Sequence, residues 1–404
     1  MYVNLHDSLA DDPRAIEAKD LTSACVHCGF CLSTCPTYVD RRDERDSPRG
    51  RIYLIKHLLE SGEASEQTQL HLDRCLTCRN CETACPSGMQ YAQLLDIGRE
   101  LVEEKVPRSA AQRILRHGLR AIFANPALLS PLLALGRAAS PLLPGALRRK
   151  IPARSRPGPR PVTRHQRVVL ALDGCVQQAA TPATNAAIAR VLDRLGITLL
   201  SINEAGCCGA LDQHLSAQDA ARNSIRRNID AWWPSIEQGA EAIVSSATGC
   251  GAMVADYGRL LADDPAYADK AARVSALHLD IGQLLAREDL GALAPLPGDE
   301  RIAVHTPCSL QHGLKTPGQI EDILSRAGFE LTEHGPVLCC GSAGSYSLLQ
   351  SQISERVRER ALSTLAAGDP QLIVTANIGC QLHLQGGTDI PVKHWIELLD
   401  SAPE

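Results

Sequence analysis

The chain has 404 residues, enough for about two to four domains, and its 44% hydrophobic and 22% charged composition is that of a globular protein. Aromatic residues make up only 3%, which disfavours a flavin held between aromatic rings, and at a net charge of −5 we expect no nucleic-acid partner. The polar, acidic N-terminus lacks the apolar core of a signal peptide. No uninterrupted apolar stretch reaches the roughly 20 residues that span a bilayer. We therefore expect a cytoplasmic protein without a transmembrane helix.

Cysteine is the most informative residue type in this chain. The sixteen cysteines fall into two groups, eight between Cys25 and Cys85 and eight between Cys175 and Cys380. In a reducing compartment, regularly spaced thiols bind metal more often than they pair as disulfides. Both groups therefore predict metal sites.

The first group is a repeated C-x2-C-x2-C-x3-C-P pattern, with an offset of 50 residues at every cysteine. In this pattern three closely spaced thiolates bind one cluster and the fourth cysteine binds the other cluster. Zinc ribbons, which use two separated cysteine pairs, fit the spacing less well. The sequence predicts two [4Fe–4S] clusters. The expected ligands are Cys25, Cys28, Cys31 and Cys85 for cluster 1, and Cys75, Cys78, Cys81 and Cys35 for cluster 2.

The segment between the two patterns predicts a helix. Within residues 49–60, Ile52, Ile55, Leu58 and Leu59 recur at helical spacing. The two patterns also lie further apart than in a minimal bacterial ferredoxin. We expect a helical ferredoxin domain with two [4Fe–4S] clusters at residues 1–105, resembling that of respiratory iron–sulfur subunits.

A basic linker is expected at residues 106–166. Between Glu104 and Asp173 there are fourteen Lys or Arg and no acidic residue. Residues 110–124 predict an amphipathic helix, and residues 151–167 predict an extended tether. The apolar side of this helix holds Ile114, Leu115, Leu119, Ile122 and Phe123, and the basic side holds Arg113, Arg116, His117 and Arg120. Such a helix can lie on an anionic membrane, dock on an acidic partner, or pack on its own chain.

The C-terminal half contains a second, longer repeat. Cys175, Cys207 and Cys250 recur as Cys308, Cys339 and Cys380, with offsets of 133, 132 and 130 residues. The first and last cysteines of each copy follow short runs rich in Val and Ile, and helical segments lie between them. This order is typical of parallel α/β units, in which loops after the strands converge at one edge of the sheet. We expect an α+β multidomain protein with duplicated α/β domains at residues 167–298 and 299–404.

Each copy brings four thiols into one candidate metal site. The two sets are Cys175, Cys207, Cys208 and Cys250, and Cys308, Cys339, Cys340 and Cys380. The copies are similar to the cysteine-rich "CCG" domains of heterodisulfide reductase subunits. That family's pattern ends in C-x-x-C, whereas Met253 and His383 occupy the last position here, which argues against a five-thiolate cluster. Four thiols could hold a further iron–sulfur cluster or zinc, or one copy could be structural.

The whole arrangement resembles the iron–sulfur subunits of glycolate oxidase. The closest motifs are VHCGFCLSTCPTY, SPRGRIYLIK, HLDRCLTCRNCETACPSG, EAGCCGALDQHL, NIDAWWP and VTANIGCQLHL. The resemblance implies a glycolate dehydrogenase complex, in which flavin-containing subunits oxidise glycolate to glyoxylate. This chain would pass the electrons to a membrane quinone or another non-oxygen acceptor. With the basic linker, such a role predicts a peripheral protein on the inner face of the cell membrane.

We expect no catalytic residues in this chain, because no G-x-G-x-x-G motif or catalytic-base motif is found. The chain alone is therefore not expected to oxidise glycolate. Two alternatives stay open. Subunits of lactate and glycerol-3-phosphate dehydrogenases share this architecture, and the CCG domains could catalyse thiol–disulfide exchange at Cys207–Cys208 or Cys339–Cys340.

Overall fold

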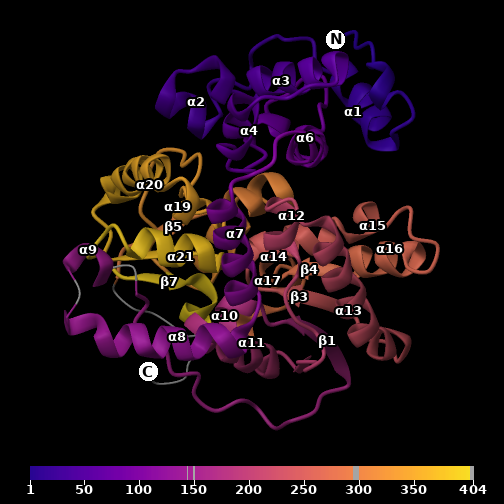
Figure 1. Ribbon diagram of the computed structural model, residues 1–404. Helices are drawn as coiled ribbons and strands as arrows, with labels where there is room; N and C mark the ends of the chain where they lie inside the picture. The colour runs from indigo at the N-terminus through magenta and orange to yellow at the C-terminus, as the bar shows by residue number, and fades with distance from the viewer. Residues whose placement is uncertain (143, 149–150, 294–299, 401–404) are drawn as a thin grey trace. The chain divides into compact units, whose positions relative to one another are not determined.

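The computed structural model describes residues 1–142, 144–148, 151–293 and 300–400 (Figure 1). The chain divides into two compact units. The first contains Met1–His117, Gln213–Ser216 and Leu338–Ala361, and the second contains Gly118–Asp212, Ala217–Val337 and Leu362–Glu404. The domain limits expected from the sequence stay predictions, and the limit at residues 298 and 299 lies outside the described residues.

The first unit is built from helices. They are η1 (Asp7–Leu9), α1 (Pro13–Ser23), α2 (Pro36–Arg41), η2 (Glu44–Asp46), α3 (Pro48–Ser61), α4 (Glu66–Asp73), α5 (Asn80–Thr83) and α6 (Tyr91–Lys105), followed late in the chain by α19 (Tyr346–Leu349) and most of α20 (Ser351–Leu365). The expected helix at residues 49–60 is confirmed as α3, which buries Ile52, Ile55, Leu58 and Leu59.

Helix α3 owes its limits to local chemistry. Ser47 caps its N-terminus by accepting a hydrogen bond from the Gly50 N–H, and Pro48 occupies the first helical position. Gly62 ends the helix in a left-handed conformation. Its buried face packs against α6, where Gly98 leaves room for Ile55: a Cβ at that glycine would lie 2.6 Å from the Ile55 Cδ1. This packing holds α3, which lies between the two cysteine patterns, against α6.

Helices α7 (Ala110–Phe123) and α8 (Pro126–Ala139) occupy the predicted linker, followed by η3 (Ser140–Leu142) and α9 (Gly145–Arg148). The amphipathic helix predicted there is confirmed as α7. Among the described residues, no single helix is long and apolar enough to cross a membrane. In the same part of the chain, α7 and residues Pro126–Leu142 pass this test as a pair, which is bent by 96° and qualifies by length and composition alone.

The second unit contains two parallel sheets. The first has the order β2-β1-β3-β4, and the second has the order β5-β6-β7. The strands are β1 (Arg167–Leu172), β2 (Ile197–Leu200), β3 (Ala242–Ser245), β4 (His278–Asp280), β5 (Ile302–His305), β6 (Leu372–Thr375) and β7 (Val392–His394). The duplication is visible in the topology, since β1-β3-β4 corresponds to β5-β6-β7. The counterpart of β2 is reduced to one parallel bridge between Ile302 and Leu331. The expected duplicated α/β fold is confirmed.

Helices connect the strands of both sheets. In the first copy they are α10 (Cys175–Ala180), α11 (Pro182–Arg194), α12 (Ala210–His214), α13 (Gln218–Glu237), α14 (Thr248–Ala255), α15 (Tyr257–Leu260), α16 (Ala268–Leu277) and α17 (Ile281–Leu285), followed by η4 (Leu290–Leu293). In the second copy they are η5 (Ser309–Gly313), α18 (Gln319–Arg326), α20, η6 (Ala366–Gly368), α21 (Ile378–Gln385) and η7 (Trp395–Leu399). One apolar core joins residues of both copies, among them Val169, Val244, Val304, Val374 and Trp395.

Candidate metal centres

The two N-terminal cysteine loops share one backbone conformation. His27 and Thr77 occupy equivalent positions and have φ values of 55° and 52°, and Gly29 and Arg79, also equivalent, have φ values of 87° and 60°. Residues other than glycine rarely adopt a positive φ. The recurrence of positive φ at equivalent positions therefore marks a specific loop structure. In the second loop this turn aims the Thr77 N–H at the Cys75 Sγ, 3.4 Å away.

The first cavity, cavity 1, lies beside the first loop. Its lining includes all four cysteines expected to bind cluster 1, Cys25, Cys28, Cys31 and Cys85, together with Cys81. Cys28 is exposed, and the neighbouring Val26 and Phe30 side chains are 66% and 65% exposed. Cavity 1 therefore reaches the protein surface. Burial raises the pKa of the Cys31 thiol to about 11.

The second cavity, cavity 2, is lined by the four cysteines expected to bind cluster 2, Cys35, Cys75, Cys78 and Cys81. Each of the four is less than one tenth exposed. Burial, followed by the proximity of other thiols, raises the pKa of Cys78 and of Cys81 well above the ordinary value. The Tyr91 hydroxyl donates a hydrogen bond to the Cys75 Sγ at 3.7 Å, and Tyr91 lines both cavities.

These donor sets suit iron–sulfur clusters. Soft thiolates are the preferred ligands of such clusters, and four of them are needed for each cubane. A buried group of thiols that resists ionisation on its own gains the missing positive charge from the metal. Backbone and side-chain donors to sulfur, such as Thr77 N–H and the Tyr91 hydroxyl, are the contacts that tune such clusters.

A late segment of the chain lies against the second loop within the first unit. The Asn80 side-chain amide donates to the Leu338 carbonyl at 2.9 Å, and the Tyr346 hydroxyl donates to the Arg74 carbonyl at 3.1 Å. The Cys339 thiol lies close enough to Cys78 to contribute to its raised pKa, after burial. Cys339 thus lies near Cys78, one of the cysteines that line cavity 2.

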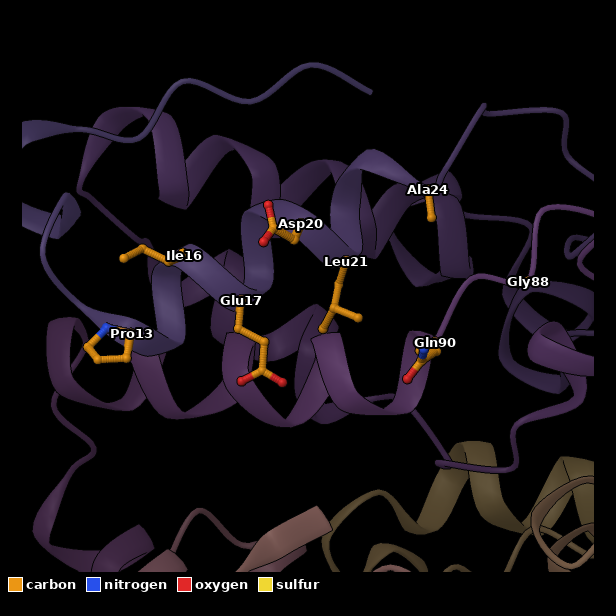
Figure 2. Close-up of a pocket in the computed structure, with 8 residues that line it drawn as sticks. All are labelled: Pro13, Ile16, Glu17, Asp20, Leu21, Ala24, Gly88 and Gln90. Carbon is orange, nitrogen blue, oxygen red and sulfur yellow. The ribbon is translucent and has the colours of Figure 1, made fainter. Parts of the chain in front are cut away.

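A groove of about 570 Å³ lies elsewhere in the first unit, along α1 (Figure 2). Ile16, Glu17 and Asp20 of α1 line it together with Gly88 and Gln90. None of its eight labelled residues is a cysteine. The groove therefore offers no thiol ligand.

In the second unit, the four thiols of the first CCG copy converge. The Sγ atoms of Cys175 and Cys207 are 3.6 Å apart, and Cys208 contacts both Cys207 and Cys250. Hydrogen bonding from Cys175 and Cys208 lowers the pKa of Cys207 well below its ordinary value. Gly209 has a φ of 89°, which turns the chain directly after the adjacent cysteines.

Buried polar side chains hold this first CCG site. Asn228, which is 0% exposed, accepts a hydrogen bond from the Gly206 N–H at 2.8 Å and donates to the Cys207 carbonyl at 3.0 Å. The Tyr257 hydroxyl donates to the Cys208 carbonyl at 2.8 Å. The adjacent cysteines are thus fixed through their backbone, which leaves their sulfur atoms for binding.

The four thiols of the second CCG copy are divided between the units. Cys339 and Cys340 belong to the first unit, and Cys308 and Cys380 belong to the second. Cys380 lies on α21, is 3% exposed, and accepts a hydrogen bond from the Asn377 amide at 3.5 Å. Met253, at the position where the CCG pattern has a further cysteine, is buried in the apolar core of its own copy.

The sequence interpretation missed the buried polar residues around these sites. Arg51 lines cavity 2 and is 0% exposed. A signal was available, because Arg51 lies four residues before Ile55 and seven before Leu58, on the apolar side of α3. A charged residue at such a position predicts a buried partner. Asn228 and Tyr257 gave no comparable signal.

Comparison with known proteins agrees with these sites. Residues 24–89 match the 4Fe-4S dicluster domain family, and residues 169–255 and 302–385 match the cysteine-rich domain family CCG. The chain is 52% identical to the glycolate oxidase iron-sulfur subunit of Escherichia coli (strain K12), with 100% of both chains covered. It is 29% identical to the probable glycolate oxidase iron-sulfur subunit of Bacillus subtilis (strain 168), over 90% of this chain and 88% of that protein. Lactate utilization protein A of Bacillus subtilis (strain 168) is 26% identical over 53% of this chain.

The dicluster domain and the paired cysteine-rich domains define an iron–sulfur electron-transfer protein, whose N-terminal domain implies two [4Fe–4S] clusters. Within that class, the chain belongs to the family of glycolate oxidase iron–sulfur subunits. The resemblance inferred from the sequence is confirmed. Membership of this family implies further subunits of the same complex.

The hydrogen bonds of Asn228 at the first CCG site lead to a testable prediction. Asn228→Ala leaves the Gly206 N–H without its acceptor and should lower the free energy of unfolding by about 1–3 kcal/mol. It should leave the iron and sulfide content of the N-terminal domain unchanged. Denaturant unfolding and metal analysis measure these effects. Asn223→Ala, at an exposed position of the same helix, is the matched control, and equal effects in both variants would contradict the prediction.

Proposed function

We propose that this chain relays electrons from a flavin-containing subunit, which oxidises glycolate to glyoxylate, toward a membrane quinone or another non-oxygen acceptor. The observation that carries the proposal is the pair of cavities, each lined by its four expected cysteine ligands, which share Cys81 and Tyr91 in their linings. Two clusters so placed would be near enough to exchange electrons. The full-length likeness to a glycolate oxidase iron-sulfur subunit supports the choice of substrate over lactate or glycerol 3-phosphate.

We propose the ligand sets expected from the sequence. Cluster 1 would be bound by Cys25, Cys28, Cys31 and Cys85, and cluster 2 by Cys75, Cys78, Cys81 and Cys35. The last cysteine of each pattern would then bind the cluster of the other pattern. In support, Cys35 lines cavity 2 and Cys85 lines cavity 1.

Cross-ligation predicts opposite outcomes for two neighbouring cysteines. Cys35→Ser should damage cluster 2, whereas Cys31→Ser, four residues earlier, should damage cluster 1. A purely local disturbance would affect the same cluster in both variants. Iron and sulfide content, together with EPR spectra of the reduced full-length protein, distinguish these outcomes.

The relay predicts that the chain has no oxidase activity of its own. The purified full-length chain should not oxidise glycolate, and adding the flavin-containing subunit should restore electron transfer to a quinone analogue. Replacing glycolate with lactate or glycerol 3-phosphate in the same assay tests the alternative substrates. Stoichiometric flavin on the isolated chain would falsify the relay.

For the CCG sites, we propose that the four converging thiols of the first copy hold a further iron–sulfur cluster or a zinc ion. Thiol–disulfide exchange is the alternative, and it needs a thiol pair that solvent can reach. Cys207 and Cys208 are only 4% and 3% exposed, and Cys339 and Cys340 are 4% and 2% exposed. This burial favours metal binding.

We also propose peripheral attachment to the inner face of the cell membrane, with a contact surface different from the one expected. On α7, Arg116 pairs with Asp73 at 2.9 Å and Arg120 pairs with Asp212 at 2.5 Å, so acids of the chain itself occupy part of the basic side. The apolar side is instead open, with Ile114 72% exposed.

Helix α8 presents the apolar surface that suits a bilayer. Leu128, Leu132 and Leu135 are 51%, 49% and 67% exposed and follow one face of the helix, while Leu129 on the other side is buried. The surrounding segment has no acidic residue and many basic ones. Exposed leucines and nearby cations together favour an anionic lipid surface.

The triple variant Leu128→Gln, Leu132→Gln, Leu135→Gln should lose most binding to anionic liposomes without changing cluster content. Leu348→Gln with Val162→Gln, which also replaces exposed apolar side chains, should bind as the unmodified chain does. High salt should weaken binding, because it screens the basic residues. Co-sedimentation with liposomes of different anionic content measures this. An absence of binding, or binding that ignores lipid charge, would instead favour contact with a partner subunit.

A further inference from the structure

A buried cation lies beside one of the two cavities. The Arg51 guanidinium lines cavity 2 together with Cys35, Cys75, Cys78 and Cys81. Its Nε donates to the His71 carbonyl at 2.7 Å, and one terminal nitrogen donates to the Thr37 hydroxyl at 3.1 Å. Arg51 is 0% exposed, so water does not screen its charge.

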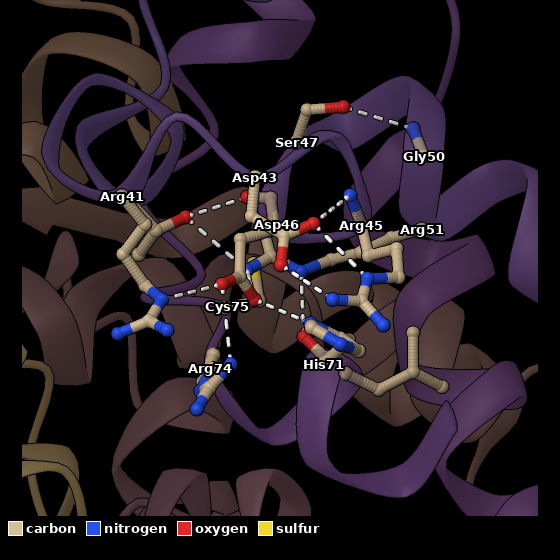
Figure 3. Close-up of polar contacts among 12 residues, drawn as sticks. Arg41, Asp43, Arg45, Asp46, Ser47, Gly50, Arg51, His71, Arg74 and Cys75 are labelled. Atoms are coloured by element: carbon tan, nitrogen blue, oxygen red, sulfur yellow. Dashed lines mark hydrogen bonds and ion pairs between the residues drawn. The ribbon is translucent and has the colours of Figure 1, made fainter. Parts of the chain in front are cut away.

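The counter-charge near Arg51 is shared among several cations (Figure 3). Asp46 lies 3.6 Å from an Arg51 terminal nitrogen and pairs more closely with Arg41 Nε at 2.8 Å and Arg74 at 3.3 Å. The His71 Nδ1 lies 2.8 Å from the same carboxylate. Three guanidinium groups thus share the Asp46 carboxylate. The nearby Asp43 carboxylate is paired with Arg45 at 2.8 Å, so a net positive charge remains beside cavity 2. Such a surrounding also disfavours a metal cation at Asp46.

A second buried arginine adds charge of the same sign. Arg99 is 8% exposed, and it donates to the Leu72 and Cys75 carbonyls at 2.9 Å and 3.0 Å. A guanidinium group stays protonated in proteins, so Arg51 and Arg99 both keep their positive charge when buried. The positive charge is therefore a fixed feature of this site.

Cavity 1 has no equivalent among its lining residues. Its arginine, Arg49, has a side chain that is 32% exposed and pairs with Glu44 at 2.6 Å. Solvent and a single close carboxylate screen this charge. The two cavities thus differ in both burial and local charge.

We propose that Arg51 is a positioning residue for electron transfer, whose buried positive charge raises the reduction potential of cluster 2 enough for it to accept an electron from cluster 1. The inference rests on the proposed pair of clusters. A cluster held by four thiolates becomes more negative on reduction, and burial opposes that change. A fixed cation at the cavity wall offsets this penalty. One electron passes from reduced cluster 1 to oxidised cluster 2, and no bond is formed or broken.

Redox titration of the full-length protein, purified anaerobically and followed by EPR, tests this proposal. Cys28→Ser identifies the signal of cluster 1, because Cys28 lines only cavity 1. Arg51→Gln should lower the equilibrium constant for reducing cluster 2 at least tenfold, a fall of 59 mV for a one-electron couple. The equilibrium constant for reducing cluster 1 should change less than threefold.

Three further variants separate charge from structure. Arg51→Lys keeps the charge and should change the equilibrium constant for reducing cluster 2 less than threefold. Asp46→Asn removes a negative charge and should shift the reduction potential of cluster 2 upward. Arg49→Gln, two residues from Arg51 on the same helix, is the matched control. It should change the equilibrium constant for reducing cluster 2 less than threefold.

Several outcomes would overturn the proposal, and each has a different meaning. Equal shifts of both clusters, unchanged potentials, or equal effects of Arg51→Gln and Arg51→Lys would overturn the role of Arg51. Loss of cluster 2 in Arg51→Gln, with no shift in Asp46→Asn, would assign Arg51 a structural role and overturn the proposal as well. Absence of labile sulfide from the unmodified protein would instead overturn the proposed clusters themselves.

Discussion

Thiolates crowded into one buried space repel one another, and the rest of this structure depends on how that repulsion is relieved. Around cavity 2, burial and neighbouring sulfur raise the pKa of Cys78 and Cys81. Metal ions supply the missing positive charge, because they bind the deprotonated form. The protein contributes what the metal cannot, which is loops held at positive φ, donors aimed at sulfur, and a buried arginine at the cavity wall. The same constraint applies to the thiols beside Asn228, where backbone hydrogen bonds hold adjacent cysteines together.

The sequence predicts the features that depend on local spacing. The ferredoxin cysteines, helix α3 and the duplicated strands follow from short patterns, and the structure confirms the helix and the duplicated fold. Arg51 illustrates the limit. Its position on the apolar side of α3 indicates burial. Asp46 lies just before α3, but His71 and Thr37 come from more distant segments whose approach no local pattern specifies.

The linker shows the same limit from another side. The amphipathic character of α7 is correctly predicted, because it follows from helical periodicity. Which side faces the protein depends on distant carboxylates: Asp73 pairs with Arg116, and Asp212 pairs with Arg120. The partners of each pair lie far apart in the sequence, so local patterns do not predict either pair. In the CCG copies, Met253 was recognised as a departure from the family pattern, but only the structure shows that its side chain joins the apolar core.

The discontinuity of the first unit has a consequence for biosynthesis. This unit begins at Met1 but is completed by Leu338–Ala361, whose Leu338 carbonyl accepts a hydrogen bond from Asn80 and whose Tyr346 donates one to the Arg74 carbonyl. During translation, the N-terminal cysteines leave the ribosome long before these residues are synthesised. The second cysteine loop therefore lacks these two hydrogen bonds for most of the synthesis of the chain. The thiols of cavity 2 are therefore synthesised well before the last residues that contact their loop.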